Sequence, residues 1–98
     1  MHARDYELMV VLSPDLDEAG VDATTERLGT QISGRGGEVV DIQKWGRRRL
    51  AYPIAKHRDG FYTVAKLKIS PEDAEPLERS LRLNESVIRH LLVRLDEE

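Results

Sequence analysis

The 98-residue sequence contains no cysteine. This excludes disulfide bonds, thiolate zinc sites and a cysteine nucleophile, and it suits a reducing compartment. Long apolar runs are also missing: the longest, residues 8–12, has five residues, whereas a membrane helix needs about 20. The start of the chain lacks the basic-then-apolar layout of a signal peptide. We therefore expect a cytoplasmic protein that does not associate with a membrane.

Residues that could build a catalytic or metal site are not grouped. His2, His57 and His90 are far apart and share no spacing that would bring three ligands to one metal ion. No serine has a base and an orienting acid nearby in the sequence. The acidic residues between Asp15 and Glu26 fall along one predicted helix as a solvated face. We expect no catalytic residues, no metal, no cofactor and no small-molecule substrate.

Charge is distributed unevenly, although the net charge is only −3. Residues 1–43 carry −6 and residues 69–98 carry −4, whereas residues 44–68 carry +7 from eight basic side chains and one acidic one. This basic segment also holds four of the five aromatic residues. Cations interleaved with aromatic rings are typical of polyanion binding, and the acidic remainder of the chain favours one local docking site.

Hydrophobic periodicity predicts six elements. Alternating apolar residues predict strands over residues 6–12, 39–54, 61–69 and 87–95, with a possible bulge at Gly46 in the second strand. Helical spacing predicts a helix from Asp15 onward that three glycines, at positions 34, 36 and 37, terminate. It predicts a second helix after Ser70.

Two local patterns refine these boundaries. Residues 56–60 end in Asp59-Gly60, which is typical of a turn, so the second and third strands should form an antiparallel hairpin. Ser70 stands before Pro71 and an acidic pair, which is typical of a helix start capped by a hydroxyl group. Pro76 predicts that the first turn of this helix is irregular.

The order of elements predicts an α+β fold, a single ferredoxin-like split βαββαβ domain over residues 1–98. Right-handed crossovers place the first and third strands at the centre of a four-stranded antiparallel sheet and the other two strands at its edges. Both helices then pack on one face, and the other face stays open.

Three functions that occur on this fold can be compared with the residues. Small phosphatases carry a phosphate-binding loop after the first strand, but residues 13–16 offer an acid where an arginine is needed. Single-strand RNA readers carry a basic-glycine-aromatic run in the third strand, and residues 58–64 match it only in part. Thr63 stands in place of one stacking ring, and the matching face of the first strand offers Leu8 and Val10 in place of aromatic residues. A regulatory module that binds a small ligand between paired sheets fits the fold but gives no reason for three consecutive arginines.

The arginine triplet at positions 47–49 has two interpretations. Because neighbours in a strand point to opposite faces, Arg47 and Arg49 should share a face with Trp45, and Arg48 should lie on the other. The triplet could protect an edge strand against aggregation. Alternatively it binds phosphates and a protein partner. Three more basic residues at positions 56–58, with only Asp59 to neutralise them, favour the second interpretation.

Residues 46–54 read Gly-Arg-Arg-Arg-Leu-Ala-Tyr-Pro-Ile, a run that chance would rarely produce at this distance from Tyr6-Glu7 before it and Asn84-Glu85 after it. Together with further matches over nearly the whole chain, it resembles the ribosomal protein six family of the bacterial small subunit. The resemblance implies a ferredoxin-like scaffold in the ribosome. It also implies that the scaffold pairs with ribosomal protein eighteen and docks on the central domain of the small-subunit ribosomal RNA during assembly, without a catalytic role.

The resemblance and the charge pattern together identify candidate contacts with RNA or with the partner protein. In this interpretation Trp45 and Tyr52 are packing residues and do not stack on bases. The candidate contact residues are Arg4, Arg47, Arg48, Arg49, Lys56, His57, Arg58, Arg82 and Arg89.

Overall fold

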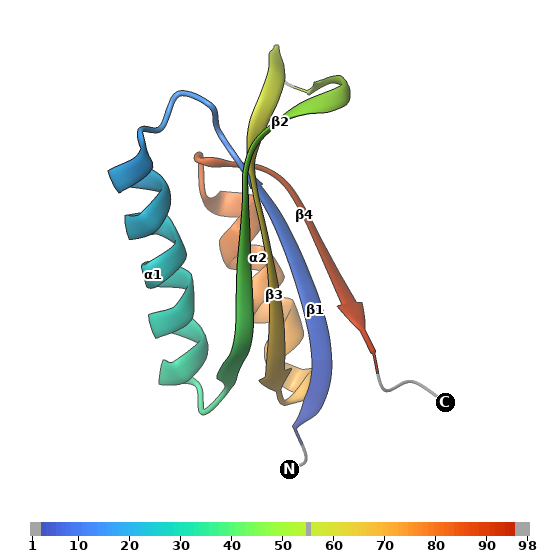
Figure 1. Ribbon diagram of the computed structural model, residues 1–98. Helices are drawn as coiled ribbons and strands as arrows, with labels where there is room; N and C mark the ends of the chain where they lie inside the picture. The colour runs from blue at the N-terminus through green and yellow to red at the C-terminus, as the bar shows by residue number, and fades with distance from the viewer. Residues whose placement is uncertain (1–2, 55, 96–98) are drawn as a thin grey trace.

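The computed structural model describes residues 3–54 and 56–95, and its elements follow the predicted order (Figure 1). They are β1 (Arg4–Leu12), α1 (Glu18–Gly34), β2 (Glu38–Ile54), β3 (His57–Ile69), a single 3₁₀ turn η1 (Pro71–Asp73), α2 (Ala74–Leu83) and β4 (Val87–Arg94). Within these residues, no helix is long and apolar enough to cross a membrane.

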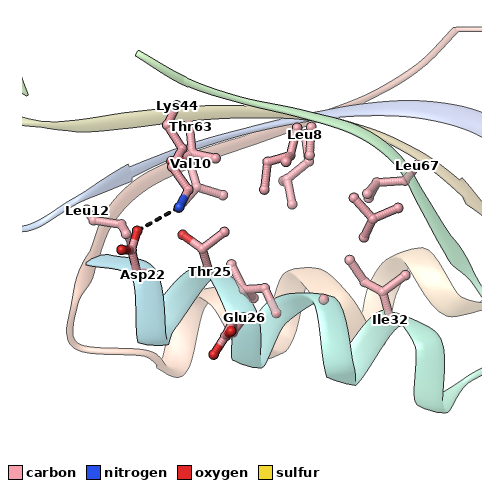
Figure 2. Close-up of a pocket in the computed structure, with 15 residues that line it drawn as sticks. Leu8, Val10, Leu12, Asp22, Thr25, Glu26, Ile32, Lys44, Thr63 and Leu67 are labelled. Carbon is pink, nitrogen blue, oxygen red and sulfur yellow. Dashed lines mark hydrogen bonds and ion pairs between the residues drawn. The ribbon is translucent and has the colours of Figure 1, made fainter. Parts of the chain in front are cut away.

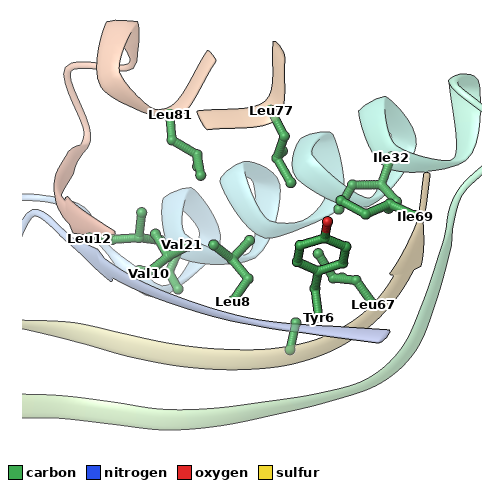
Figure 3. Close-up of a cluster of buried hydrophobic side chains, with 11 residues drawn as sticks. Tyr6, Leu8, Val10, Leu12, Val21, Ile32, Leu67, Ile69, Leu77 and Leu81 are labelled. Carbon is green, nitrogen blue, oxygen red and sulfur yellow. The ribbon is translucent and has the colours of Figure 1, made fainter. Parts of the chain in front are cut away.

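The four strands form one antiparallel sheet in the order β2-β3-β1-β4. The first and third strands are therefore central and the other two lie at the edges, as predicted. Both helices lie on the same side of the sheet (Figures 1 and 3). No helix of the described residues covers the other side, which we call the open face. The ferredoxin-like prediction is confirmed.

The core lies between the helices and the helix-facing side of the sheet (Figure 3). Period-two alternation in the central strands and four-residue spacing in α2 bring apolar side chains into this layer. Burial of each large aliphatic side chain contributes about 1.5–3 kcal/mol relative to exposure. The buried cluster consists of Tyr6, Leu8, Val10, Leu12, Val21, Ile32, Ala65, Leu67, Ile69, Leu77 and Leu81.

Helix α1 begins at Glu18, three residues after the predicted start at Asp15. The side chain of Asp17 caps it, because its Oδ1 accepts a hydrogen bond from the backbone N of Gly20 at 2.7 Å. The backbone N of Asp15 donates to Ser13 Oγ at 3.1 Å, which holds the preceding residues in a turn. The helix ends at Gly34, and Gly36 has a φ of 85°, so the glycines terminate it as predicted.

The start of α2 differs from the prediction in its cap. Ser70 makes no side-chain hydrogen bond to the helix backbone; its Oγ donates instead to Glu72 Oε1 at 3.3 Å. The single 3₁₀ turn η1 is the irregular first turn that Pro76 predicts. Pro76 is the third residue of α2, where the missing N–H would have no acceptor within the α-helix.

The turn of the β2–β3 hairpin is not at Asp59-Gly60. Ile54 pairs with His57, so β3 begins four residues before the predicted start, and both Asp59 and Gly60 lie inside it. Gly60 is required by close packing: a Cβ atom there would lie 2.6 Å from Val11 Cγ1 and 2.9 Å from the carbonyl oxygen of Leu12. The Asp59-Gly60 pattern therefore does not mark a turn here; its glycine allows β3 and β1 to pack closely.

Candidate functional site

The basic residues of segment 44–68 are carried by the hairpin of β2 and β3, whose tip projects beyond the N-terminal end of α1 (Figure 1). The two strands pair from Glu38 opposite Lys68 to Ile54 opposite His57. We refer to residues 44–62 as the basic hairpin. Most of its described side chains are accessible, on one face of the sheet or the other, and the face on which a side chain lies decides what it can contact.

A bulge in β2 determines these faces. The pairing shifts between Lys44, opposite Thr63, and Gly46, opposite Tyr62, so that Trp45 is the extra residue. Gly46 has a φ of 80°, a left-handed conformation that glycine adopts without a steric cost. The predicted bulge is confirmed. Because one extra residue reverses the alternation, Trp45 lies on the face of Arg48, and the prediction that it shares a face with Arg47 and Arg49 is wrong.

Arg47 connects the basic hairpin to the loop after β1 by a hydrogen bond. Its Nη1 is 3.0 Å from Asp59 Oδ2, and its Nη2 donates to the carbonyl oxygen of Pro14 at 3.1 Å. Its guanidinium carbon lies 4.9 Å from the ring centroid of Phe61. The side chain is half exposed, so the ion pair adds only a modest stabilisation. These three contacts indicate a structural role for Arg47. They also pair Asp59, the one acidic residue of the basic hairpin, with Arg47.

On the open face, Arg48, Trp45 and Tyr62 form a stack. The rings of Trp45 and Tyr62 are nearly parallel, at 11°, with centroids 6.4 Å apart, and the guanidinium carbon of Arg48 lies 5.6 Å from the Trp45 ring. Trp45 remains 46% exposed and Tyr52 60% exposed. Trp45 thus packs against Tyr62 and Arg48 and keeps exposed surface, as Tyr52 does. That these two rings pack and do not stack on bases stays a prediction.

Three cations of the basic segment have acidic partners: Lys44 with Asp22 at 2.6 Å, Arg47 with Asp59 at 3.0 Å, and Lys68 with Asp5 at 3.4 Å. The other five make no ion pair with any of residues 3–54 and 56–95, and all five are exposed. They are Arg48, Arg49, Lys56, Arg58 and Lys66.

The remaining candidates are dispersed. Arg89 of β4 pairs with Val11, which pairs with Tyr62, so the three residues form one row across the open face. Two strand spacings, roughly 10 Å, separate Arg89 from Tyr62. Arg82 at the end of α2 is ion-paired with Glu75 at 2.8 Å. Arg4 pairs with Ile69 at the opposite end of β1 from the hairpin contacts.

The open face differs from that of a single-strand RNA reader. Leu8 and Val10 of β1, which we expected on the matching face, are core residues, and Thr63 is also on the helix side. The residues of β1 on the open face alternate with them, and among these Met9 is paired with Val64. Tyr62 is thus the only aromatic residue of the two central strands that lies on the open face within the described chain. No group of three or more potential metal ligands occurs among the described residues.

Comparison with protein families identifies the chain. The family model for ribosomal protein S6 matches residues 5–94. The chain belongs to the ribosomal protein S6 family. A small ribosomal subunit protein bS6 from Carboxydothermus hydrogenoformans is 43% identical over 94 residues, covering 96% of this chain and 98% of the relative. The corresponding protein of Mycolicibacterium paratuberculosis is 47% identical, with coverage of 96% and 98%.

A solved structure agrees with this assignment. The crystal structure of 30S ribosomal protein S6 from Thermotoga maritima has a TM-score of 0.90 and 29% sequence identity, covering 95% of this chain and 88% of that one. Membership of the S6 family makes the chain a component of the bacterial small ribosomal subunit, in the cytoplasm, and not an enzyme.

Sequence reasoning missed two contributors to the site in this S6 family member. Tyr62, which stacks on Trp45, and Lys66, which is exposed and has no acidic partner among the described residues, were not among the candidates. The glycine at position 46 was the available signal for Tyr62, because a bulge there places Trp45 beside it. No local signal marks Lys66, which the strand register places between Glu7 and Asp41 without an ion pair to either.

Proposed function

We propose that the chain binds the central domain of small-subunit ribosomal RNA together with ribosomal protein eighteen and thereby aids subunit assembly. The observation that carries this proposal is a set of four exposed cations on the basic hairpin that make no ion pair with a described residue: Arg48, Arg49, Lys56 and Arg58. Lys66 lies farther along β3. Arginine and lysine side chains displace counterions from phosphates, and the rigid sheet fixes their register on folded RNA. Base reading plays a minor part.

The open face supports a protein partner beside the RNA. Trp45 is 46% exposed, and Leu91 and Val93 of β4, which alternate with the core-facing Leu92, are 49% and 42% exposed. Exposed apolar side chains on one face favour a protein interface there. Phosphate contacts from the hairpin and apolar contacts from the open face would then act on one joint surface.

The decisive experiment is footprinting of a central-domain RNA fragment with this chain, with ribosomal protein eighteen, and with both. We expect weak, salt-sensitive protection by this chain alone and much stronger protection by the pair. The fluorescence of Trp45, the only tryptophan, provides a second readout of partner binding. If the mixture shows no protection beyond that given by ribosomal protein eighteen, the proposed function is wrong.

The site itself is tested with the double variant Arg48→Ala/Arg49→Ala. Loss of two phosphate contacts should weaken RNA binding by the pair about 10- to 100-fold and reduce the slope of log affinity against log salt by about 2. The matched control is Arg27→Ala/Arg79→Ala, which removes the same charge from exposed positions on α1 and α2. If both double variants bind alike, the arginine triplet protects an edge strand and is not a binding site.

A further inference from the structure

A cavity of about 420 Å³ lies between α1 and the helix-facing side of the sheet (Figure 2). Two of the residues that α1 contributes to its wall are small, at positions 25 and 29. Gly29 lines the cavity, and a Cβ atom built on it would meet no other atom within 4 Å. Thr25 also lines it, one turn earlier on the same helix. The volume falls in the range of about 300–1,000 Å³ that is typical of small-molecule sites.

The cavity walls are mainly apolar, and three charged residues also line the cavity. Leu8, Val10 and Leu67 project into it from the two central strands (Figure 2). At the end nearest the hairpin, Lys44 Nζ is 2.6 Å from Asp22 Oδ1, and both side chains are about half exposed. Glu26 is the other charged residue that lines the cavity. The lysine is therefore already neutralised, and the net charge of these groups is negative.

One polar group in the cavity wall has no hydrogen-bond partner in the part of the chain that the structure describes. Thr63 is 7% exposed, and its Oγ1 makes no hydrogen bond with any described residue. The other threonine of the wall differs, because Thr25 Oγ1 donates to the carbonyl oxygen of Val21 at 2.8 Å. A buried hydroxyl without a partner costs free energy, which a bound group with hydrogen-bonding capacity would recover.

We propose that this cavity is a binding site for a small neutral amphiphile, a molecule with an aromatic or aliphatic body and a single hydroxyl or amide group that hydrogen-bonds Thr63. The apolar walls accept the body, and the Thr63 hydroxyl can donate to or accept from the polar group. An anion is disfavoured, because Asp22 and Glu26 would repel it and Lys44 is paired. The site is on the helix side of the sheet, away from the stack on the open face, and does not depend on the proposed ribosomal role.

The test uses three probes of similar shape: p-cresol, which is neutral and has a hydroxyl group; p-xylene, which has none; and p-toluate, which is anionic. Chemical shifts of the methyl groups of Leu8, Val10 and Leu67 report binding. We expect saturable shifts with p-cresol, and binding of p-toluate at least tenfold weaker. Thr63→Val keeps the side-chain shape and should weaken p-cresol binding about three- to tenfold while leaving p-xylene binding unchanged.

Gly29→Leu tests the location of the site. The added side chain should fill the cavity and abolish the shifts caused by both p-cresol and p-xylene. The matched control is Gly34→Ala on the same helix, at a position that does not line the cavity and has open space for a Cβ atom. If Gly29→Leu does not fold, the proposal is tested by Thr63→Val alone, through its separate effects on p-cresol and p-xylene binding. Absence of saturable shifts in these methyl groups up to about 1 mM p-cresol, or equal effects of Thr63→Val on both neutral probes, would overturn the proposal.

Discussion

Arg47 and Arg48 are neighbours in the chain but contact different parts of the molecule. Arg47 holds Asp59, Pro14 and the Phe61 ring on the helix side of the sheet, whereas Arg48 lies over Trp45 on the open face. The sequence shows two neighbouring arginines and predicts that both lie near the hairpin tip. It does not predict that Arg47 uses the one nearby acid, because that depends on which residues β3 places opposite it. A charge count therefore overestimates the number of cations available to RNA.

Gly60 was predicted to form a turn, and the structure places it in a close contact between β3 and β1. We expect Gly60→Ala to lower the free energy of unfolding by about 1–3 kcal/mol, because its Cβ would overlap Val11 Cγ1 and the Leu12 carbonyl oxygen. Urea denaturation followed by circular dichroism measures this change. A free energy of unfolding within about 0.5 kcal/mol of the wild-type value would mean that β1 and β3 can move apart at this position with little loss of stability.

The type and order of the elements were predictable from hydrophobic periodicity, whereas several of their first residues were not. The alternation over residues 6–12 and the four-residue spacing of Leu77 and Leu81 gave the correct elements, because each pattern matches the face that is buried. The cap at Ser70 and the turn at Asp59-Gly60 were wrong. Serine and glycine satisfy several local structures equally well, so tertiary contacts decide between them.

The bulge in β2 sets the composition of both hairpin faces. Gly46→Ala places a Cβ atom on a residue with a φ of 80°, which should cost about 1–2 kcal/mol of stability. If β2 responds by losing the bulge, Trp45 turns away from Tyr62, and its fluorescence emission and near-ultraviolet circular dichroism change as well.

Gly34→Ala is the matched control for this bulge variant, because Gly34 does not have a positive φ and an added Cβ there would meet open space. It should leave the emission of Trp45 unchanged and stability equal or slightly higher. Equal stability of Gly46→Ala and Gly34→Ala would show that the left-handed conformation at position 46 is not required.

The whole molecule depends on β4 because it completes the sheet beside β1. Removal of residues 85–98 would expose the second edge of β1 and remove Val87 and Leu92 from the core. We expect this truncated chain to lose its cooperative thermal transition and its dispersed amide chemical shifts. A cooperative transition with native-like dispersion in the truncated chain would contradict this expectation.

The sheet order also has a consequence for synthesis. β1 is the first strand to be made, yet its two neighbours are β3 and β4, the last two strands of the chain. Contacts between distant parts of a sequence form slowly, because the loop between them must close first. While the chain is being made, β1 therefore has both edges unpaired until β3 has been translated, and one edge unpaired until β4 follows. During that interval its protection from aggregation must come from its surroundings, since the protein's own partner strands do not yet exist.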